Sequence, residues 1–434
     1  MIKTMAKTKF QLARGFQDFY PQELAERRWL FEKMREVSRR FGYQEYEGPC
    51  VEPLSLYVAK SSEELVRQQT FILSGRGGEK LALRPELTPT LARMIAQKQI
   101  NLPKPIRWFS IGPRWRYEKP QKGRTREFYQ WDIDLLGIET PEADAELITI
   151  AAEFFKSVGL TPKEVVIKVN NRRLMEEKLN FIEIPPQLTP QIFRAIDKKE
   201  KMTERKWEKW LEEIGLNKLQ TRDLRKILAD KDFAGESEEL TNLFSTLSDM
   251  GVANYVEFDP AVIRGLDYYT GTVFEAQDRA GKFRAILGGG RYDNLVETIG
   301  GSRISGVGFA AGDKVVEEVL RKFNKWPTIN PLPTKVLVTV FNESLYRESL
   351  KIARQLREAK IPTELYLTVD KLDKQLKYAN RQKIPYVVIL GPEEEEKRIV
   401  TVKNLKTGGQ KTYPQEALTK EIKKIIKSQM DNEE

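Results

Sequence analysis

The sequence lacks residue types that many functional classes require. Its 434 residues include no histidine, and Cys50 is the single cysteine. Without histidine, a Ser-His-Asp triad, a Cys-His pair and histidine-based metal sites are excluded. One cysteine allows neither an internal disulfide nor a cysteine-based zinc site, and we expect Cys50 to be a small buried apolar residue. Chemistry must therefore depend on carboxylates, arginines, lysines and tyrosines, and we expect no metal site built by the protein itself.

Long apolar stretches are also missing. No run approaches the roughly 18 to 20 residues that a bilayer-spanning helix needs, and the first ten residues, MIKTMAKTKF, lack the apolar segment of a secretion signal. We therefore expect a cytoplasmic protein with no membrane partner. Lysine and arginine outnumber aspartate and glutamate by 73 to 63, a net charge of +10 at pH 7. This excess favours a polyanionic partner such as nucleic acid.

The pattern of expected elements indicates an α+β chain in several parts. A long amphipathic helix is predicted over 21–42, and sheet-like segments alternate with helices up to residue 325. Within this part, residues from about 172 to 252 are helical and strongly charged, which indicates an inserted helical module. Residues 326–333 have the proline density of a linker, and 334–434 alternate strand and helix, which predicts a small α/β domain with a largely parallel sheet.

Three glycine-rich segments do not match a phosphate-binding loop. SGRGGEK, at 74–80, lacks the required spacing and is predicted to be a hairpin turn. LGGGRYDNL, at 287–295, is predicted to be a strand end that lets another backbone or a flat ligand approach closely. GVGFAAG, at 306–312, is predicted to be a buried strand that enters a helix. If ATP binds, arginines on an antiparallel sheet must hold its phosphates.

Two segments supply such arginines. If RWRYE (114–118) and FYQWDID (128–134) pair as antiparallel strands, alternation gathers polar side chains on one face. Apolar residues alternate with this polar set, so the polar face is predicted to line a cleft, although a solvated amphipathic hairpin is the alternative. The joining loop is basic, and it is positioned to touch a nucleic acid. The polar set is Arg114, Arg116, Glu118, Gln130, Asp132 and Asp134; the apolar set is Trp131, Ile133 and Leu135; the loop carries Lys119, Lys122, Arg124 and Arg126.

The stretch AVIRGLDYYTGTVFEA, at 261–276, places Arg264 beside Tyr268 and Tyr269 in what otherwise resembles a buried strand. Burying an unpaired charge costs several kcal/mol or more. Two explanations remain open: a structural ion pair with Asp267 or Asp259, or an anionic ligand as the partner.

Several of these motifs together resemble the histidyl-tRNA synthetases, a family of class II aminoacyl-tRNA synthetases. They are ARGFQDFYP, LRPELTPTLAR, RYEKPQKGRTREFYQWDIDLLG, RGLDYYTGTVFEA and GGGRYDNLV, and they span most of the chain in family order. The resemblance implies a catalytic domain on an antiparallel sheet with flanking helices over 1–325 and an anticodon-binding domain over 334–434. It also implies a homodimer whose first motif includes the long helix and Pro49. The expected activity is a histidine–tRNA ligase reaction that uses histidine, ATP with substrate-bound Mg²⁺, and tRNA(His).

The resemblance also implies roles for individual residues. Arg116 and Arg264 would act on the α-phosphate, Glu118 would face the adenosine, and Arg124 would join the ATP site. Histidine's amino group would contact Glu86 and Gln130, near Thr88. Its imidazole would lie between Asp134 and Tyr269, with Tyr268 lining the pocket. Lys119 and Gln121 would approach the tRNA acceptor end.

One motif departs from the family pattern. The third class II motif usually ends in an arginine that contacts the far phosphates of ATP, whereas GFAAGDKVVEEVL has Val315 at that place. Lys314, Arg303 or Arg124 could substitute for it. The departure leaves an alternative function open, a non-catalytic synthetase paralogue that acts as a regulatory subunit or tRNA sensor, although such subunits generally lack the terminal α/β domain. A general basic RNA-binding protein would explain the charge but not the arginine and tyrosine pocket.

The missing histidines suggest a hypothesis. A synthetase free of its own amino acid can be translated when charged histidyl-tRNA is scarce, whereas chance composition or engineering would explain the absence equally well. Reporter synthesis from this coding sequence under histidine limitation tests the idea, and a fall equal to that of histidine-containing controls would remove it.

Overall fold

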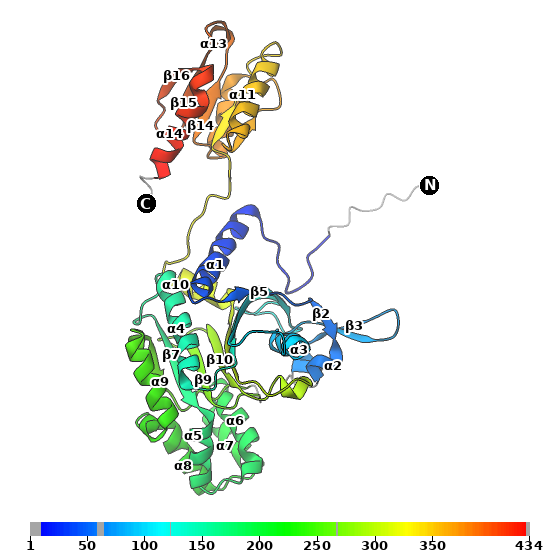
Figure 1. Ribbon diagram of the computed structural model, residues 1–434, viewed down its shortest axis with the longest axis vertical. Coiled ribbons are helices and arrows are strands. Elements are labelled where there is room, and N and C mark those ends of the chain that lie inside the picture. The colour runs from blue at the N-terminus through cyan, green and yellow to red at the C-terminus, as the bar shows by residue number, and fades with distance from the viewer. Residues whose placement is uncertain (1–9, 59–64, 122, 266–267, 431–434) are drawn as a thin grey trace. The chain divides into compact units, whose positions relative to one another are not determined.

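The computed structural model describes residues 10–58, 65–121, 123–265 and 268–430 (Figure 1). The chain divides into two compact units, residues 1–328 and 329–434. Among the described residues, no helix combines the length and apolar character needed to span a bilayer.

The first unit is built on an eight-stranded sheet in the order β1-β5-β6-β11-β10-β9-β7-β8. The five central pairings, from β5–β6 to β9–β7, are antiparallel, and the two edge pairings are parallel. The predicted antiparallel sheet is therefore confirmed. The strands are β1 Gln44–Glu45, β5 Ile106–Trp115, β6 Glu127–Leu136, β7 Val165–Asn171, β8 Val256–Phe258, β9 Thr272–Asp278, β10 Leu287–Tyr292 and β11 Gly306–Gly312.

One face of this sheet is covered by apolar packing against helices. Trp131 of β6 is fully buried, and its ring lies 5.2 Å from that of Phe154 in α4 and 5.0 Å from that of Phe309 in β11. Ile133 and Leu135 are fully buried on the same side, as alternation predicts. The polar residues of β6 consequently face the other way. Outside the stretch from about 172 to 252, the helices whose apolar residues join this core are α1 Pro21–Arg40, α4 Pro141–Ser157 and α10 Asp313–Lys322.

A second, three-stranded sheet has the order β2-β4-β3. The hairpin predicted around SGRGGEK joins its strands β3 and β4, closed by a bond from the Gly75 amide to the Glu79 carbonyl of 2.9 Å. Cys50 lies in a bend just before β2 and is exposed, so the expectation of a buried cysteine is wrong. The elements here are β2 Val51–Pro53, α2 Leu54–Val58, a π-helical turn Leu65–Gln69, β3 Phe71–Ser74, β4 Lys80–Leu83 and α3 Thr88–Lys98.

The stretch from about 172 to 252 consists of helices that lie together in Figure 1, in the green part of the colour range. Trp207 and Leu224 of these helices belong to the same buried apolar cluster as Trp131 of the sheet. We call this part the helical module; its continuous core with the sheet explains why both fall in one unit. Its helices are α5 Arg172–Phe181, α6 Thr189–Asp197, α7 Glu204–Ile214, α8 Lys218–Ala229 and α9 Glu238–Asp249, with 3₁₀ turns at Pro186–Leu188, Lys199–Lys201 and Phe233–Glu236.

The second unit is an α/β domain on a five-stranded sheet in the order β13-β12-β14-β15-β16. β12 pairs in parallel with β13 and β14, but β15 and β16 are antiparallel. The expected largely parallel sheet is therefore a mixed one, because the chain after β14 forms a hairpin. Its elements are β12 Val336–Val338, α11 Tyr346–Glu358, β13 Thr363–Leu365, α12 Leu372–Arg381, β14 Tyr386–Ile389, α13 Pro392–Glu396, β15 Ile399–Asn404, β16 Gln410–Pro414 and α14 Leu418–Met430.

Candidate active site

A cavity of about 1880 Å³ opens on the polar face of the eight-stranded sheet. Lys119 and Gln121 are exposed and do not line the cavity. Lys122 lies outside the described residues. The cavity does bring together ten residues expected at the site: Glu86, Thr88, Arg116, Glu118, Arg124, Gln130, Asp134, Arg264, Tyr268 and Tyr269.

The floor of the cavity is the polar face of β6. Gln130, Asp132 and Asp134 alternate along the strand and line the cavity, and Asp132 accepts a 2.7 Å bond from buried Arg114. The antiparallel pairing of β5 with β6 confirms the expected hairpin. The strand β5 ends at Trp115, however, so the prediction of a strand through Glu118 extends too far.

Asp134 lies in a buried, ring-lined part of the floor. Burial raises the pKa of its carboxyl to about 8, the charge of Asp132 adds to the rise, and the hydrogen bond from Tyr292 opposes it. The Tyr292 hydroxyl donates to Asp134 at 2.5 Å, and the Tyr268 ring lies 6.0 Å from the Tyr292 ring and 4.8 Å from that of Tyr269. A carboxyl group surrounded by rings suits a flat ligand that carries a hydrogen-bonding nitrogen.

Arg264 projects from a loop and not from a strand. The strand β9 begins only at Thr272, so the strand expected over 261–276 is wrong for its first half. The reason is local: Arg264 has φ of 62°, a left-handed conformation that no strand residue adopts and that costs about 1 kcal/mol or more outside glycine. Such conformations gather at functional sites, where the surrounding structure maintains them.

The ion-pair partner of Arg264 is Glu275 of β9. Asp259 pairs instead with Lys168 at 3.0 Å, and Asp267 lies outside the described residues. Burial would lower the pKa of Arg264, but Glu275 outweighs it and the pKa is raised, so the guanidinium stays charged. Its Nε is buried and has no hydrogen-bond partner among the described residues. The pair with Glu275 thus leaves donor capacity for an anionic ligand.

Gly288 of β10 explains part of the glycine run. A Cβ on Gly288 would overlap the Arg264 guanidinium, so this glycine makes the space in which the cation lies. The predicted close approach of another backbone is confirmed at Gly289 and Gly290, where a Cβ would meet the carbonyls of Gly308 and Thr272, whereas the close neighbour of Gly288 is an arginine side chain.

Arg116 is held differently. Its Nε donates to the Pro85 carbonyl at 3.0 Å, and its guanidinium carbon lies 5.4 Å from the centre of the Phe128 ring. Among the described residues it forms no ion pair with a carboxylate. Arg116 and Arg264 thus line one cavity, although they come from distant parts of the chain.

Two of the three candidates for the missing third-motif arginine are near enough to serve. Lys314 and Arg124 line the cavity, whereas Arg303 does not and instead pairs with Glu139 at 3.5 Å. Lys314 Nζ donates to Gln17 at 2.9 Å. Arg124 pairs with Glu118.

Sequence reasoning missed several residues that line the cavity. Glu275 was not expected at the site, although the alternation of Val273, Glu275 and Gln277 against Phe274 and Ala276 could have indicated a polar face. The cations of the helical module gave no signal, because only tertiary folding brings them to the sheet. Those that line the cavity include Arg194, Lys198, Lys199, Lys201 and Lys231. Among the described residues, no cluster of three or more acidic or cysteine side chains could hold a metal ion.

Comparison with known proteins shows which proteins this chain is similar to. Residues 15–316 match the family described as histidyl-tRNA synthetase, and residues 335–425 match the anticodon binding domain. The chain is 34% identical over 420 residues to a histidine–tRNA ligase of Leptospira biflexa, covering 94% of this chain and 96% of that protein. It is 37% identical over 407 residues to the chloroplastic/mitochondrial histidine–tRNA ligase of Arabidopsis thaliana, covering 92% of this chain and 83% of that one. The crystal structure of histidyl-tRNA synthetase from Nostoc sp. PCC 7120 is similar with a TM-score of 0.80 and 28% identity, covering 96% of this chain and 100% of that chain.

Proposed function

This chain belongs to the histidyl-tRNA synthetase family, and from that premise we propose how its residues carry out the ATP-dependent ligation of histidine to tRNA. The family model covers 302 of the 434 residues, counted from 15 to 316, and the activity is that of a class II histidine–tRNA ligase. The observation that carries the residue assignment is that Arg116 and Arg264, distant in sequence, line one cavity above the Asp134 pocket.

The first proposed step joins histidine to AMP. A carboxylate oxygen of histidine attacks the α-phosphorus of ATP, the bond from that phosphorus to the bridging oxygen breaks, and pyrophosphate leaves with the electron pair. No proton is transferred in this step, so the protein need not supply a general acid or a general base. The lack of histidine side chains is therefore no obstacle to the reaction. Arg116 and Arg264 hold the reactants in line and offset the charge that grows on the phosphate oxygens.

The substrate histidine occupies the inner part of the cavity in this proposal. Asp134 and Tyr269 contact the imidazole, Tyr268 lines the pocket, and Glu86 and Gln130 take the α-amino group, with Thr88 at the start of α3. The Gln130 side-chain oxygen is buried without a partner among the described residues, which makes it available to accept from an ammonium group.

The nucleotide occupies the outer part. Glu118 faces the adenosine, and Arg124 and Lys314 approach the distal phosphates in place of the missing arginine. Mg²⁺ enters on the phosphates of ATP as part of the substrate and shares their charge.

The second step transfers histidine to tRNA(His). A hydroxyl oxygen of the terminal ribose attacks the carbonyl carbon of the adenylate. The bond from that carbon to the phosphate oxygen breaks, AMP leaves with the electron pair, and the hydroxyl proton passes to a phosphate oxygen of the leaving AMP. Lys119 and Gln121, exposed on the loop after β5, are proposed to contact the acceptor end.

We assign residues 1–325 to catalysis, 326–333 to a linker and 334–434 to anticodon binding. We place the reaction in the cytoplasm, unlike that of the plant relative.

We also propose that the chain forms a homodimer. The three-stranded sheet and α2 expose a group of apolar side chains that a second copy would cover: Val51, Val58, Ile72 and Leu73, between 37% and 60% exposed. Sedimentation should give twice the mass of the 50.3 kDa chain. The double variant Ile72→Lys with Leu73→Lys should sediment with the mass of a single chain. A monomeric wild type would contradict the proposal. Maleimide labelling of Cys50, the residue before β2, should be slower in the dimer than in that variant.

Pyrophosphate exchange into ATP tests the proposed function. The chain, purified without a polyhistidine tag, is assayed with each amino acid in turn. Exchange with histidine alone is the expected result. No exchange with any amino acid would favour the non-catalytic paralogue, and exchange with another amino acid would overturn the assignment of Asp134 and the tyrosines.

A further inference from the structure

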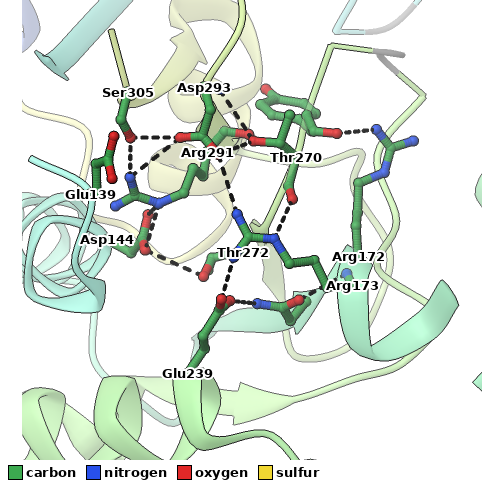
Figure 2. A network of polar contacts seen from close by, with 12 residues as sticks. Glu139, Asp144, Arg172, Arg173, Glu239, Thr270, Thr272, Arg291, Asp293 and Ser305 are labelled. Atoms are coloured by element: carbon green, nitrogen blue, oxygen red, sulfur yellow. Dashed lines mark hydrogen bonds and ion pairs between the residues drawn. The ribbon is translucent and has the colours of Figure 1, made fainter. Parts of the chain in front are cut away.

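The loop that carries Tyr268 and Tyr269 is fastened by the first turn of helix α5 in the helical module. Arg172 Nη1 donates to the Tyr269 carbonyl at 2.8 Å, Arg173 Nε donates to the Thr270 carbonyl at 3.1 Å, and the Arg172 amide donates to the Gly271 carbonyl at 3.0 Å. Figure 2 shows both arginines reaching the loop from α5. Three consecutive carbonyls of the loop therefore have donors in the module.

Arg173 also joins other elements. Its Nη1 pairs with Glu239 of α9, and its Nη2 lies 3.3 Å from Asp293, just after β10 (Figure 2). Asp293 accepts from the Thr270 hydroxyl at 2.7 Å, so Thr270 is held through its backbone and its side chain. One guanidinium thus connects the loop, the sheet and two helices of the module.

The sheet side of this network is rigid. Asp293 accepts from Ser305 at 2.6 Å, and Ser305 accepts from Arg291 at 2.5 Å. Arg291 in turn forms two bonds of 3.1 Å to Asp144 of α4, and both side chains of this pair are less than 5% exposed. The network therefore ends in the core of the unit.

The module side is different. The side chains of Arg173 and Glu239 are 49% and 39% exposed. Exposed ion pairs contribute little to stability because water screens them. The contribution of Arg173 to stability is therefore expected to be small. Its guanidinium contacts both the Thr270 carbonyl and Asp293, and these two contacts fix the position of the loop at Thr270.

We propose that Arg173 is a positioning residue for histidine. It sets the place of Thr270, and through it that of Tyr268 and Tyr269, and its pair with Glu239 makes this place depend on the helical module. The inference rests on the proposed function, because it assigns the tyrosines to histidine. A displacement of α5 or α9 is transmitted to the histidine pocket and not to the Arg116 side of the cavity.

The test compares Arg173→Ala with a matched control, Arg222→Ala. Arg222 lies in α8 of the same module, is 58% exposed and pairs only with Asp223 among the described residues. In pyrophosphate exchange, Arg173→Ala should raise the KM for histidine about 10- to 150-fold, the loss expected for a hydrogen bond to a charged group. The KM for ATP should stay within about twofold, and Arg222→Ala should match the wild type in both.

Two further variants guard against misfolding. Arg173→Lys keeps the charge but not the planar fork, so its KM for histidine should lie between those of the wild type and Arg173→Ala. Glu239→Gln removes the charge that pairs with Arg173 but keeps a side-chain oxygen that can accept from Asn171, and it should raise the same KM by a smaller factor. The thermal midpoints of both should stay near that of the wild type.

The outcomes are separable from those of the proposed function. Wild-type exchange with histidine must be present in any case. Its absence would defeat the proposed function, and with it the inference that depends on that function. If the wild type is active and the variants at Arg173 change both KM values equally, or neither, Arg173 does not position histidine.

Discussion

The floor and the rim of the cavity are held in opposite ways. The floor, strand β6, lies in a regular ladder between β5 and β11, with every second side chain in the apolar core. The rim, residues 261–271, has no strand among its described residues, contains Arg264 in a left-handed conformation and is held by side-chain donors to its carbonyls. Burial fixes the floor, whereas the rim, although Val262 and Ile263 are buried, also depends on directional polar bonds. Substitutions should therefore separate stability from chemistry.

The largest effect is expected at the floor. Trp131→Ala removes a fully buried ring that packs on Phe154 and Phe309, and it should lower the free energy of unfolding by about 3–5 kcal/mol. Urea unfolding of both proteins measures the change. A loss below about 1 kcal/mol would show that the core does not fix the floor.

At the rim, the chemistry should suffer instead. Arg264→Ala removes a charge placed before the reaction, and it should reduce kcat for pyrophosphate exchange by about 10² to 10³, or 2.7–4 kcal/mol. Arg303→Ala, an exposed arginine outside the cavity, is the control and should remain near wild type. Equal activity of the two variants would remove Arg264 from the mechanism.

Where floor and rim meet, a single methyl group should matter. Gly288→Ala places a Cβ in the space of the Arg264 guanidinium, so the rim must shift, and we expect at least about a tenfold loss of exchange rate, or 1.4 kcal/mol. Gly235→Ala meets nothing within 4 Å and serves as control. An active Gly288→Ala enzyme would show that the position of Arg264 is not critical.

The last expected effect is a change in how stability varies with pH. The pKa of Asp134 is about 8 in the folded chain against an ordinary 3.8, so between these values the folded chain keeps a proton that the unfolded chain has released. Its contribution to stability is fully present below pH 3.8 and is lost as the pH rises to about 8. Relative to Asp134→Asn, the wild type should lose stability from pH 5 to pH 8.

Unfolding without ligand at both pH values measures this slope. Tyr292→Phe removes a hydrogen bond that favours the charged carboxyl, so the loss should continue to higher pH in that variant. Parallel profiles for the wild type and Asp134→Asn would mean that Asp134 does not titrate in this range.

The same contrast decides what the sequence could predict. The pairing of β5 with β6 and the burial of Trp131, Ile133 and Leu135 follow from alternation, because a regular ladder leaves a period of two in the sequence. The helix predicted over 21–42 ends two residues earlier, at Arg40. Helical spacing can be recognised in a sequence, but the residue at which a helix ends cannot be located as closely.

The sequence of the rim shows no such alternation of polar and apolar residues. Its conformation depends on Arg172 and Arg173, about a hundred positions earlier in the chain, and on Glu275, which pairs with Arg264 only because β9 lies beside the loop. The exposure of Cys50 and the hairpin β15–β16 were missed because each depends on how an edge of a sheet is completed.

The register between β6 and β11 places Gly308 opposite Asp134, and a Cβ there would overlap the carboxyl group. A shift of β11 by one residue would bring Val307 or Phe309 to that position and turn the glycine toward the core. An insertion or deletion of one residue in β11 should therefore damage this pocket, as a side chain at Gly308 would. When diverged relatives are compared, we expect both the length of this strand and the glycine to be kept.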